Sequence, residues 1–597
     1  MTEPQTKTCK NCHQSFAITA EDFGFYEKMQ VPPPTWCPQC GFAQKMLWRN
    51  EKTLYWGQCN LCGKKTMSMY PANGAPFPVY CHGCFLSDAW DPMQYGSPYD
   101  FTRSFFEQFH VLVNAFPRVA ILQYGTSVNC EFANYTRNTK NAYLAYGIST
   151  GENIYYSNIV DWCKDTVDSL MSKNSELLYE GFNSDRCYKC QFVVNCRDCA
   201  DSGYLYDCVN CQNCFMSANL RNGQYIFRGE QFTKEEYEKA ISGVDFGSAN
   251  VRVNLIHDLS SLMTNCVHKY ADVAKVANCT GDYILNCKNA KNSFSVYEAE
   301  DVSWAIRALK TKDINRVYSC GEGSELVYDG ILGGKGSSRI AFFASADTLR
   351  ESQYTDWCSN SANLFACVGL RNKQYCILNT QYTKEEYEAL IPRIKKHMDD
   401  MPYIDSKGRE YRYGEFFPPE LSPFAYNETI AQEYFPLTKD EATKQGFRWR
   451  DPDTKEYKVT KQPDSLPDHI KDIDDSILQE VIGCSHAGTC SHQCTTAFKI
   501  IPEELSFYRR MNLPLPRLCP NCRHYERLKQ RNPLKLWHRT CMCGVQTTHD
   551  KGQMTGHKNT TTHAHGEKPC PNEFETSYAP ERKETVYCEN CYNAEVV

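Results

Sequence analysis

Aromatic and aliphatic residues recur about every 12 positions through the middle of the chain, and polar residues that favour turns lie between them. Short apolar segments at even spacing are typical of a β-sandwich, a β-barrel or a β-solenoid. The fixed period favours a parallel β-solenoid, because each coil buries its apolar face against its neighbours. We expect about 12 residues for a strand with its turn, and roughly 24 for a full coil. The two series are Phe132, Tyr143, Tyr155, Val167, Tyr179, Phe192, Tyr204, Phe215 and Tyr225, then Tyr283, Phe294, Trp304, Val317, Val327, Phe342, Tyr354, Phe365 and Tyr375.

The periodic region is itself duplicated. The segment NLRNGQYIFRGEQFTKEEYE (219–238) returns as GLRNKQYCILNTQYTKEEYE (369–388). Within each TKEEYE, a Thr precedes a Glu by three positions, which is the pattern of a capping box and predicts the start of a helix. We expect each helix to cover the open end of one solenoid half. The amphipathic segment 100–117 predicts another helix, which would cap the first coil.

Cysteine is unusually abundant, with 34 residues in a chain of 597, and many of them form CxxC pairs. The first residues contain no apolar stretch of the kind that a secretory signal needs, and no apolar run approaches the length of a membrane span. We therefore expect a cytoplasmic protein whose paired thiols bind zinc, because closely spaced thiolates suit one tetrahedral ion. The alternative is an exported protein with disulfides.

The N-terminal region contains four CxxC pairs. Two pairs complete one tetrahedral zinc site, and four thiolates leave no open position for catalysis. Sequential pairing predicts two sites, although interleaved pairing is also compatible with the sequence. The expected ligands are Cys9, Cys12, Cys37, Cys40, Cys59, Cys62, Cys81 and Cys84.

The C-terminal region repeats this plan 482 positions later, with one CxxxC and one CxC in place of CxxC. We expect two further zinc ions here, and about four in the whole chain. The expected ligands are Cys490, Cys494, Cys519, Cys522, Cys541, Cys543, Cys588 and Cys591. Other possible donors, which we interpret as bystanders, are Cys484, His486, His492 and Cys570, and a loop expected to be a mobile polar insertion holds His549, His557, His563 and His565.

The first half of each terminal module resembles a family of small domains of the zinc-ribbon type. The shared features in the first copy are Cys9–Cys12, Phe16, Phe23, Phe25–Tyr26, Pro34 and Cys37–Cys40, and in the second Phe507–Tyr508, Pro516 and Cys519–Cys522. The resemblance implies zinc and a small β-rich knuckle, but no particular activity. The whole chain is also similar to long cysteine-rich proteins of candidate-phyla bacteria, most distinctively in YGEFFPPELSPFAYNET (413–429); that resemblance implies no function.

These patterns predict a mostly β fold: a duplicated parallel β-solenoid between related zinc-ribbon or treble-clef-like modules, with few short capping helices. The predicted regions are an N-terminal double zinc module (1–98), a capping helix with the first solenoid half (99–240), the second half with its terminal helix (241–397), an aromatic and Pro-rich strap (398–480), and a C-terminal double zinc module with a His-rich insertion (481–597).

Cysteines between Cys187 and Cys214 follow the same 12-residue period. One interpretation is a ladder of buried thiols, since free cysteine behaves as a small hydrophobic residue. The other is a metal or iron–sulfur site, because CxxCxxC at 208–214 partly resembles a ferredoxin motif. The second interpretation would indicate a redox protein.

Basic residues are concentrated between 505 and 543, although the whole chain has a net charge of −6. Arginines on a rigid zinc knuckle can bind phosphates, and interleaved aromatics can stack on unpaired bases. The alternative is a solvated face of a small domain. The candidate nucleic-acid contacts are Arg509, Arg510, Arg517, Arg523, Arg527, Lys529, Arg531, Lys535, Trp537 and Arg539.

The leading hypothesis is a non-enzymatic zinc scaffold that presents its two modules to RNA or a ribonucleoprotein through the Arg-rich C-terminal module. The sequence contains no HExxH or P-loop motif, and it indicates no small-molecule substrate. Two alternatives remain open: an enzyme that uses the central cysteines or a solenoid groove, and a self-assembling structural protein that forms homo-oligomers.

Overall fold

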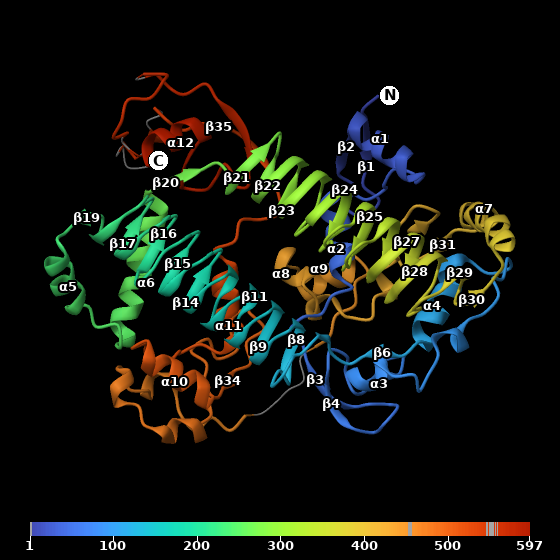
Figure 1. The fold of residues 1–597 in the computed structure, drawn as a ribbon, viewed down its shortest axis with the longest axis horizontal. Coiled ribbons are helices and arrows are strands. Elements are labelled where there is room, and N and C mark those ends of the chain that lie inside the picture. The colour runs from blue at the N-terminus through green and yellow to red at the C-terminus, as the bar shows by residue number, and fades with distance from the viewer. Residues whose placement is uncertain are drawn as a thin grey trace.

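The computed structural model describes residues 3–451, 457–544, 547–548, 554–555, 557, 559–566 and 568–597. The fold is mostly β, with short helices and with cysteine clusters at both ends of the chain. Two large sheets dominate it, and the terminal modules lie around them (Figure 1). All 34 cysteines are among the described residues, and each of them is a free thiol.

The first sheet consists of 13 strands, almost all parallel. Most paired residues lie 12 positions apart, as in Ile154 with Thr166 and Leu178 with Cys190. Strands β9 to β14 close into a parallel ring. Strand β9 pairs with both β10 and β11; β10 then pairs with β12, β11 pairs with β13, and both β12 and β13 pair with β14. The strands are β7 (Gln123–Tyr124), β8 (Phe132–Arg137), β9 (Lys140–Ser149), β10 (Glu152–Tyr155), β11 (Asn158–Asp161), β12 (Lys164–Val167), β13 (Leu170–Lys173), β14 (Glu176–Phe182), β15 (Tyr188–Val194), β16 (Gly203–Tyr206), β17 (Gln212–Ala218), β18 (Gln224–Phe227) and β19 (Glu230–Gln231).

The second sheet has 10 strands and a similar parallel register, with a spacing of 12 in most pairs, as in Ile284 with Val296. The spacing is 11 between Val273 and Ile284, and 13 between Ile314 and Val327. One turn of the chain in either sheet therefore takes a single repeat of the apolar pattern. The prediction that a full coil takes two repeats is wrong. The strands are β21 (Val273–Ala277), β22 (Gly281–Lys291), β23 (Ser293–Ser303), β24 (Leu309–Tyr318), β25 (Glu325–Ile331), β26 (Ser338–Phe343), β27 (Ala346–Thr355), β28 (Cys358–Phe365), β29 (Gln374–Ile377) and β30 (Thr380–Gln381).

A second, shorter period sets the path of the backbone. From Tyr135 to Arg228, every third residue has a positive φ, so the chain bends at each of these positions. This conformation is costly for most side chains and mildest for Gly, Asn and Asp. Asn side chains at these bends also donate hydrogen bonds from one coil to the next: Asn141 to Asn153 over 2.9 Å, and Asn153 to Asp165 over 2.7 Å. This explains why Asn and Asp are so frequent between the apolar positions.

Helices α5 (Lys234–Ser242) and α7 (Lys384–Asp400) begin at the predicted capping boxes, and α5 lies at the end of the first sheet (Figure 1). Helix α6 (Ala249–Asn265) packs against β16 and β17. Helix α4 (Phe105–Ala115) also forms, but it does not cap the first coil. Its Phe105 contacts Tyr354 and Phe365 of the second sheet, because the aromatic wall of that sheet matches its apolar stripe.

The N-terminal modules pack against the second sheet, which is far away in sequence. Tyr26 lies against Tyr328 with ring centroids 5.4 Å apart, and α2 contacts β24 (Figure 1). The elements are β1 (Gln5–Thr8), β2 (Ser15–Ile18), α1 (Ala20–Met29), α2 (Pro38–Met46), β3 (Tyr55–Gln58), β4 (Lys65–Ser68), β5 (Val79–Tyr80), α3 (His82–Leu86), η1 (Pro92–Tyr95) and β6 (Arg118–Val119).

The segment after α7 fills the space between the N-terminal modules and the second sheet. Phe417 contacts Phe109 of α4, Trp48 of the first module and Tyr354 of the second sheet. Its elements are β31 (Tyr403–Ile404), β32 (Glu410–Tyr411), η2 (Pro419–Leu421), η3 (Tyr426–Glu428), α8 (Ala431–Tyr434) and α9 (Lys439–Lys444). Three short 3-10 turns follow: η4 (Pro463–Ser465), η5 (Ile470–Asp472) and η6 (Asp475–Gln479).

The module with α10 and α11 packs against the first sheet, so the arrangement is crossed, and the last module contacts both sheets. Phe507 and Tyr508 contact Tyr179, and β39 pairs with β20 in the segment between the sheets. The elements are β20 (Val267–Lys269), β33 (Ile482–Gly483), β34 (Ala497–Phe498), α10 (Pro502–Arg510), α11 (Pro520–Leu528), β35 (Trp537–Thr540), β36 (Thr547–Thr548), β37 (Met554–Thr555), β38 (Glu573–Thr576), β39 (Thr585–Tyr587) and α12 (Glu589–Val596).

The Phe417→Ala substitution should strongly destabilise the N-terminal half, because the ring is fully buried among four aromatic neighbours. The expected loss is about 3–5 kcal/mol of unfolding free energy, measured as a lower midpoint in urea. Tyr188→Ala removes an aromatic side chain that is 48% exposed on the first sheet, and it should change the midpoint little. Equal midpoints for the two variants would contradict this packing.

Candidate metal centres

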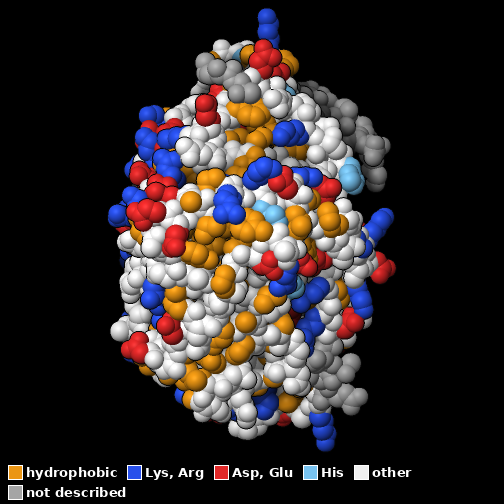
Figure 2. Space-filling model, turned by 90° about the vertical axis from the view of Figure 1, so that its right-hand side faces the viewer, with side chains coloured by type: hydrophobic (Ala, Val, Ile, Leu, Met, Phe, Trp, Pro, Cys, Tyr) orange, Lys and Arg blue, Asp and Glu red, His pale blue; other side chains and the backbone are white. Residues whose placement is uncertain are grey.

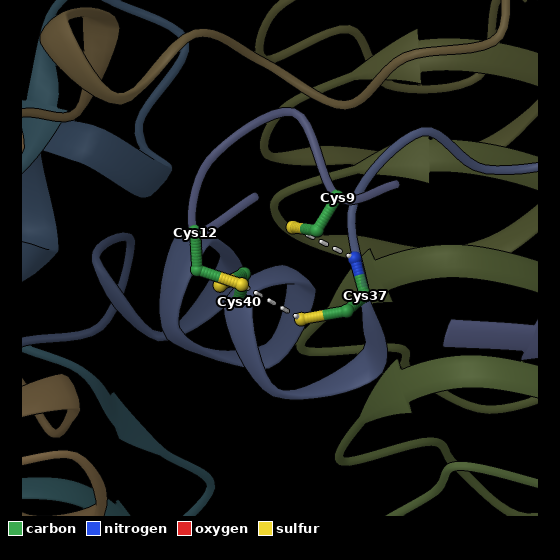
Figure 3. A group of neighbouring side chains, drawn as sticks. All are labelled: Cys9, Cys12, Cys37 and Cys40. Atoms are coloured by element: carbon green, nitrogen blue, oxygen red, sulfur yellow. Dashed lines mark hydrogen bonds between the residues drawn. The ribbon is translucent and has the colours of Figure 1, made fainter. Parts of the chain in front are cut away.

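The first cysteine cluster joins two short loops of the N-terminal module. Cys9 and Cys12 follow β1, while Cys37 caps α2 and Cys40 lies in its first turn (Figure 3). All four sulfur atoms lie within 4.8 Å of one another, and Cys12 Sγ is 3.8 Å from Cys37 Sγ. Four sulfurs around a tetrahedral ion with bonds of about 2.3 Å are about 3.8 Å apart. The spacing therefore fits a metal ion at the centre.

The second cluster repeats this geometry with Cys59, Cys62, Cys81 and Cys84. Cys62 Sγ lies 3.9 Å from Cys81 Sγ. Burial raises the pKa of Cys59, but hydrogen bonds from backbone N–H groups, that of Cys81 first, outweigh it and lower the pKa to about 6. The cluster thus favours a thiolate, the form that binds metal. In both N-terminal modules, the structure brings neighbouring CxxC pairs together in sequential order.

The third cluster differs from the predicted set. The structure brings together Cys484, Cys494, Cys519 and Cys522, with Cys484 Sγ 3.8 Å from Cys522 Sγ. Cys490 is not part of this set, and Cys484 is not a bystander. The neighbouring Cys484 thiol lowers the pKa of Cys519 to about 4.

The fourth cluster also exchanges one predicted ligand for another. It consists of Cys541, Cys570, Cys588 and Cys591, with Cys570 Sγ 3.9 Å from Cys588 Sγ. Cys570 takes the place expected for Cys543, which lies beside His563 instead. Chain distance concealed this ligand, because 28 residues separate it from Cys541.

One backbone hydrogen bond identifies the equivalent positions in all four clusters. In each, the N–H of the third cysteine donates to the sulfur of the first, over 3.2 or 3.3 Å. The four donor–acceptor pairs are Cys37 to Cys9, Cys81 to Cys59, Cys519 to Cys484, and Cys588 to Cys541. This shared bond shows that Cys484 and Cys541 correspond to Cys9 and Cys59, and that all four clusters have one design.

The central cysteines lie in the core of the first sheet. Cys196 and Cys208 are fully buried in a cluster with Leu178, Val193 and Leu205. Their thiols donate to backbone carbonyls, and burial raises the pKa of both well above its usual value. These surroundings favour the neutral thiol and match the interpretation as a buried ladder.

Two arginines of the predicted nucleic-acid patch are buried in ion pairs instead. Arg523 and Arg527 are 5% and 2% exposed. Arg527 lies 3.0 Å from Asp168 and 3.1 Å from Glu180, and Arg523 pairs with Asp168 and Glu504. These arginines hold the third module, which is the module that contains the third cluster, on the first sheet. Neither arginine can therefore reach a phosphate in solution.

The other predicted contacts have local partners too. Arg509 pairs with Asp475, Arg510 with Asp165 and Lys529 with Glu526. Arg517, Arg531 and Arg539 donate to backbone carbonyls, and the ammonium group of Lys535 lies 4.9 Å from the ring of Trp537. The side chains of this set that remain exposed are Arg509, Arg510, Lys529 and Lys535. Of the His-rich loop, His549 lies outside the described residues, and His557 pairs with Glu595.

The N-terminal half contains an equivalent of the buried ion pairs of Arg523 and Arg527, but here one of the two cations comes from the sheet. Lys45, 482 positions before Arg527, pairs with Asp329 of the second sheet. Gly41 stands where the third module has Arg523, and a Cβ there would lie 2.2 Å from the guanidinium of Arg316. Arg316 itself lies 3.1 Å from Asp329. The sheet thus supplies the cation that the module lacks.

No family model matches the chain, and comparison with curated proteins finds no similar sequence. Among the described residues, no helix combines the length and apolar character that a membrane crossing requires. The four clusters therefore carry the functional argument by their geometry alone.

The Arg523→Met substitution should destabilise the third module by about 3–5 kcal/mol, because it leaves Asp168 and Glu504 buried without this cation. Lys529→Met is the matched control, since Lys529 is exposed and its pair with Glu526 contributes about 0–1 kcal/mol. Chemical unfolding followed by tryptophan fluorescence measures both. Similar stability of the two variants would contradict the structural role of Arg523.

Proposed function

We propose that the protein is a non-enzymatic zinc scaffold that presents its terminal modules to a macromolecular partner. The observation that carries this proposal is the set of four cysteine clusters with one geometry and one N–H···S bond. A closed shell of four thiolates is typical of structural zinc, because it leaves no position for water or substrate. Zinc also matches the tetrahedral spacing of the sulfurs.

The two sheets are best interpreted as two arms of a β-solenoid. In both, most paired residues of neighbouring parallel strands lie 12 positions apart. In the first sheet, bends at every third position bring the chain back to the same side after each repeat. Each arm contributes an aromatic wall on which a terminal module packs. The arms fix the modules in place, which is the role of a scaffold.

An enzymatic role has less support. The central thiols lie in the core, as described above. A cavity of about 220 Å³ lies between the two sheets and the last module. Its charged groups largely satisfy one another: Arg197 lies 2.6 Å from Asp272, and Arg221 lies 3.2 Å from Asp207. Such pairs leave few free groups for acid–base chemistry.

We further propose that the partner is RNA or a ribonucleoprotein, bound by the exposed cations of the C-terminal modules. On the face drawn in Figure 2, acidic and basic side chains are intermixed, so this side of the molecule is not a uniformly basic surface. Arg509, Lys529 and Lys535 are exposed on the C-terminal modules. The partly exposed Trp537 beside Lys535 offers a stacking surface for an unpaired base.

Zinc content tests the scaffold proposal. Cys37→Ser removes a sulfur from the first cluster, so the purified variant should contain one ion fewer per chain than the parent protein. Cys279→Ser is the control, since Cys279 lies outside the clusters described above and donates to a backbone carbonyl. Elemental analysis of protein purified without added metal gives both numbers. A parent protein without zinc would refute the proposal.

The RNA proposal predicts a change in salt dependence. The combined variant Arg509→Gln, Lys529→Gln and Lys535→Gln should bind a labelled single-stranded RNA more weakly. Its log–log slope against salt should fall by about two. A control with the same loss of charge is Lys288→Gln, Lys310→Gln and Lys335→Gln, which lie exposed on the second sheet. Equal slopes for both variants, or no binding by the parent, would refute the RNA partner.

A further inference from the structure

The first and third clusters differ in the chain between their first two ligands. Two residues separate Cys9 from Cys12, whereas nine separate Cys484 from Cys494. The fourth cluster has the same kind of change, because a long insertion separates Cys541 from Cys570. Each insertion carries one additional cysteine and at least two histidines that the four-sulfur clusters do not use.

In the third module, these additional donors form a second group. His486, Cys490, His492 and Cys522 place one ligand atom each within 4.8 Å of one another. Cys490 Sγ lies 3.6 Å from Cys522 Sγ. The Nδ1 atoms of both histidines are buried and make no hydrogen bond. The Nδ1 atom of His492 lies 3.7 Å from a carboxylate oxygen of Glu526, which is too far for a hydrogen bond. Buried nitrogens without a hydrogen bond are costly, so they indicate a ligand.

The orientation of His492 is fixed by its neighbours. Its ring stacks on Tyr525 with an angle of 3° between the planes, and its centroid lies 5.4 Å from that of His486. The two imidazoles therefore converge beside Cys490. Two imidazoles and two thiolates are a frequent ligand set for zinc.

The fourth module forms a comparable group from unrelated sequence. Cys543 Sγ lies 3.3 Å from Nδ1 of His563 and 3.2 Å from Nε2 of His565. Nε2 of His565 also lies 3.5 Å from Cys591 Sγ. Two histidines and two cysteines thus converge again.

The far nitrogens of both histidines have the partners that metal-bound imidazoles usually have. Nε2 of His563 lies 2.9 Å from the carboxylate of Glu595, and Nδ1 of His565 lies 2.6 Å from the carbonyl of Lys568. A carboxylate or carbonyl at the far nitrogen fixes the tautomer and directs the other lone pair toward the metal. The rings are therefore already oriented for binding.

One cysteine in each module belongs to both groups. Cys522 is common to the two groups of the third module, and Cys591 contacts both groups of the fourth. A single dication among four thiolates leaves two negative charges in a buried site. A second dication, with one more thiolate and two neutral imidazoles, leaves only one. The shared thiolate therefore allows the second ion to reduce the buried charge.

We propose that each C-terminal module holds two divalent ions of the zinc type, bridged by the thiolate of Cys522 in one and of Cys591 in the other. The second site of each pair consists of two histidines, one cysteine and the bridging sulfur. This inference rests on the proposed zinc scaffold, since it requires the four-thiolate sites to be occupied. The N-terminal modules hold one ion each, so the full chain binds six.

Native mass spectrometry of the full chain, loaded with zinc and freed of excess, counts the ions directly. We expect six for the parent protein, five for His486→Ala with His492→Ala, and five for His563→Ala with His565→Ala. His257→Ala, an exposed histidine of α6, should retain six. Four ions in the parent and in both double variants would overturn the bridged sites but leave the scaffold intact. Fewer than four would overturn both.

Cadmium substitution tests the bridge itself and does not depend on how the variants fold. In ¹¹³Cd NMR of the parent protein, two metals joined by one sulfur should show spin coupling to each other. We expect two coupled pairs and two uncoupled resonances. Uncoupled resonances throughout would overturn the shared thiolates.

Discussion

The parallel register, in which most paired residues lie 12 positions apart, is the constraint on which the other parts of the structure depend. It stacks equivalent side chains above one another, so a single aromatic position becomes a continuous wall, as with Phe192 and Tyr204, whose rings stack 4.8 Å apart. Such a wall must be covered, because exposed apolar surface of this size favours association. Each terminal module covers part of one wall. The modules are small, and small domains usually need an additional source of stability such as a metal, for which their clustered thiols have the required geometry.

The crossed arrangement explains why one design occurs at both ends of the chain. Two similar walls need two similar covers, and both covers are anchored by buried ion pairs at matching positions. In one half the module supplies two arginines, Arg523 and Arg527. In the other half the module supplies Lys45 and leaves room at Gly41 for Arg316 of the sheet. The buried charges are balanced in a similar way in both halves, but the cations come from different segments of the chain. The duplication is therefore only partly visible in the residues.

Local patterns were predictable and long-range ones were not. CxxC pairs and capping boxes depend on a few neighbouring residues, so the N-terminal clusters and the starts of α5 and α7 could be predicted. The bends at every third residue were missed because Tyr, Leu and Trp occupy many of them beside Asn and Asp. Cys484 and Cys570 were missed because insertions separate them from their partners. A run of basic residues also does not show which of them are buried, so Arg523 and Arg527 were assigned to the surface.

The central claim is that bound metal keeps the terminal modules folded, so that they can pack on the two sheets. Hydrogen–deuterium exchange of the metal-loaded protein, compared with the same protein after chelation, tests it most directly. The account predicts that chelation removes protection from helices α2 and α11, and also from the strands that these helices contact, β24 and β14. The core strands farther along each sheet should keep their protection. Unchanged exchange in all four elements after complete metal removal would contradict the account.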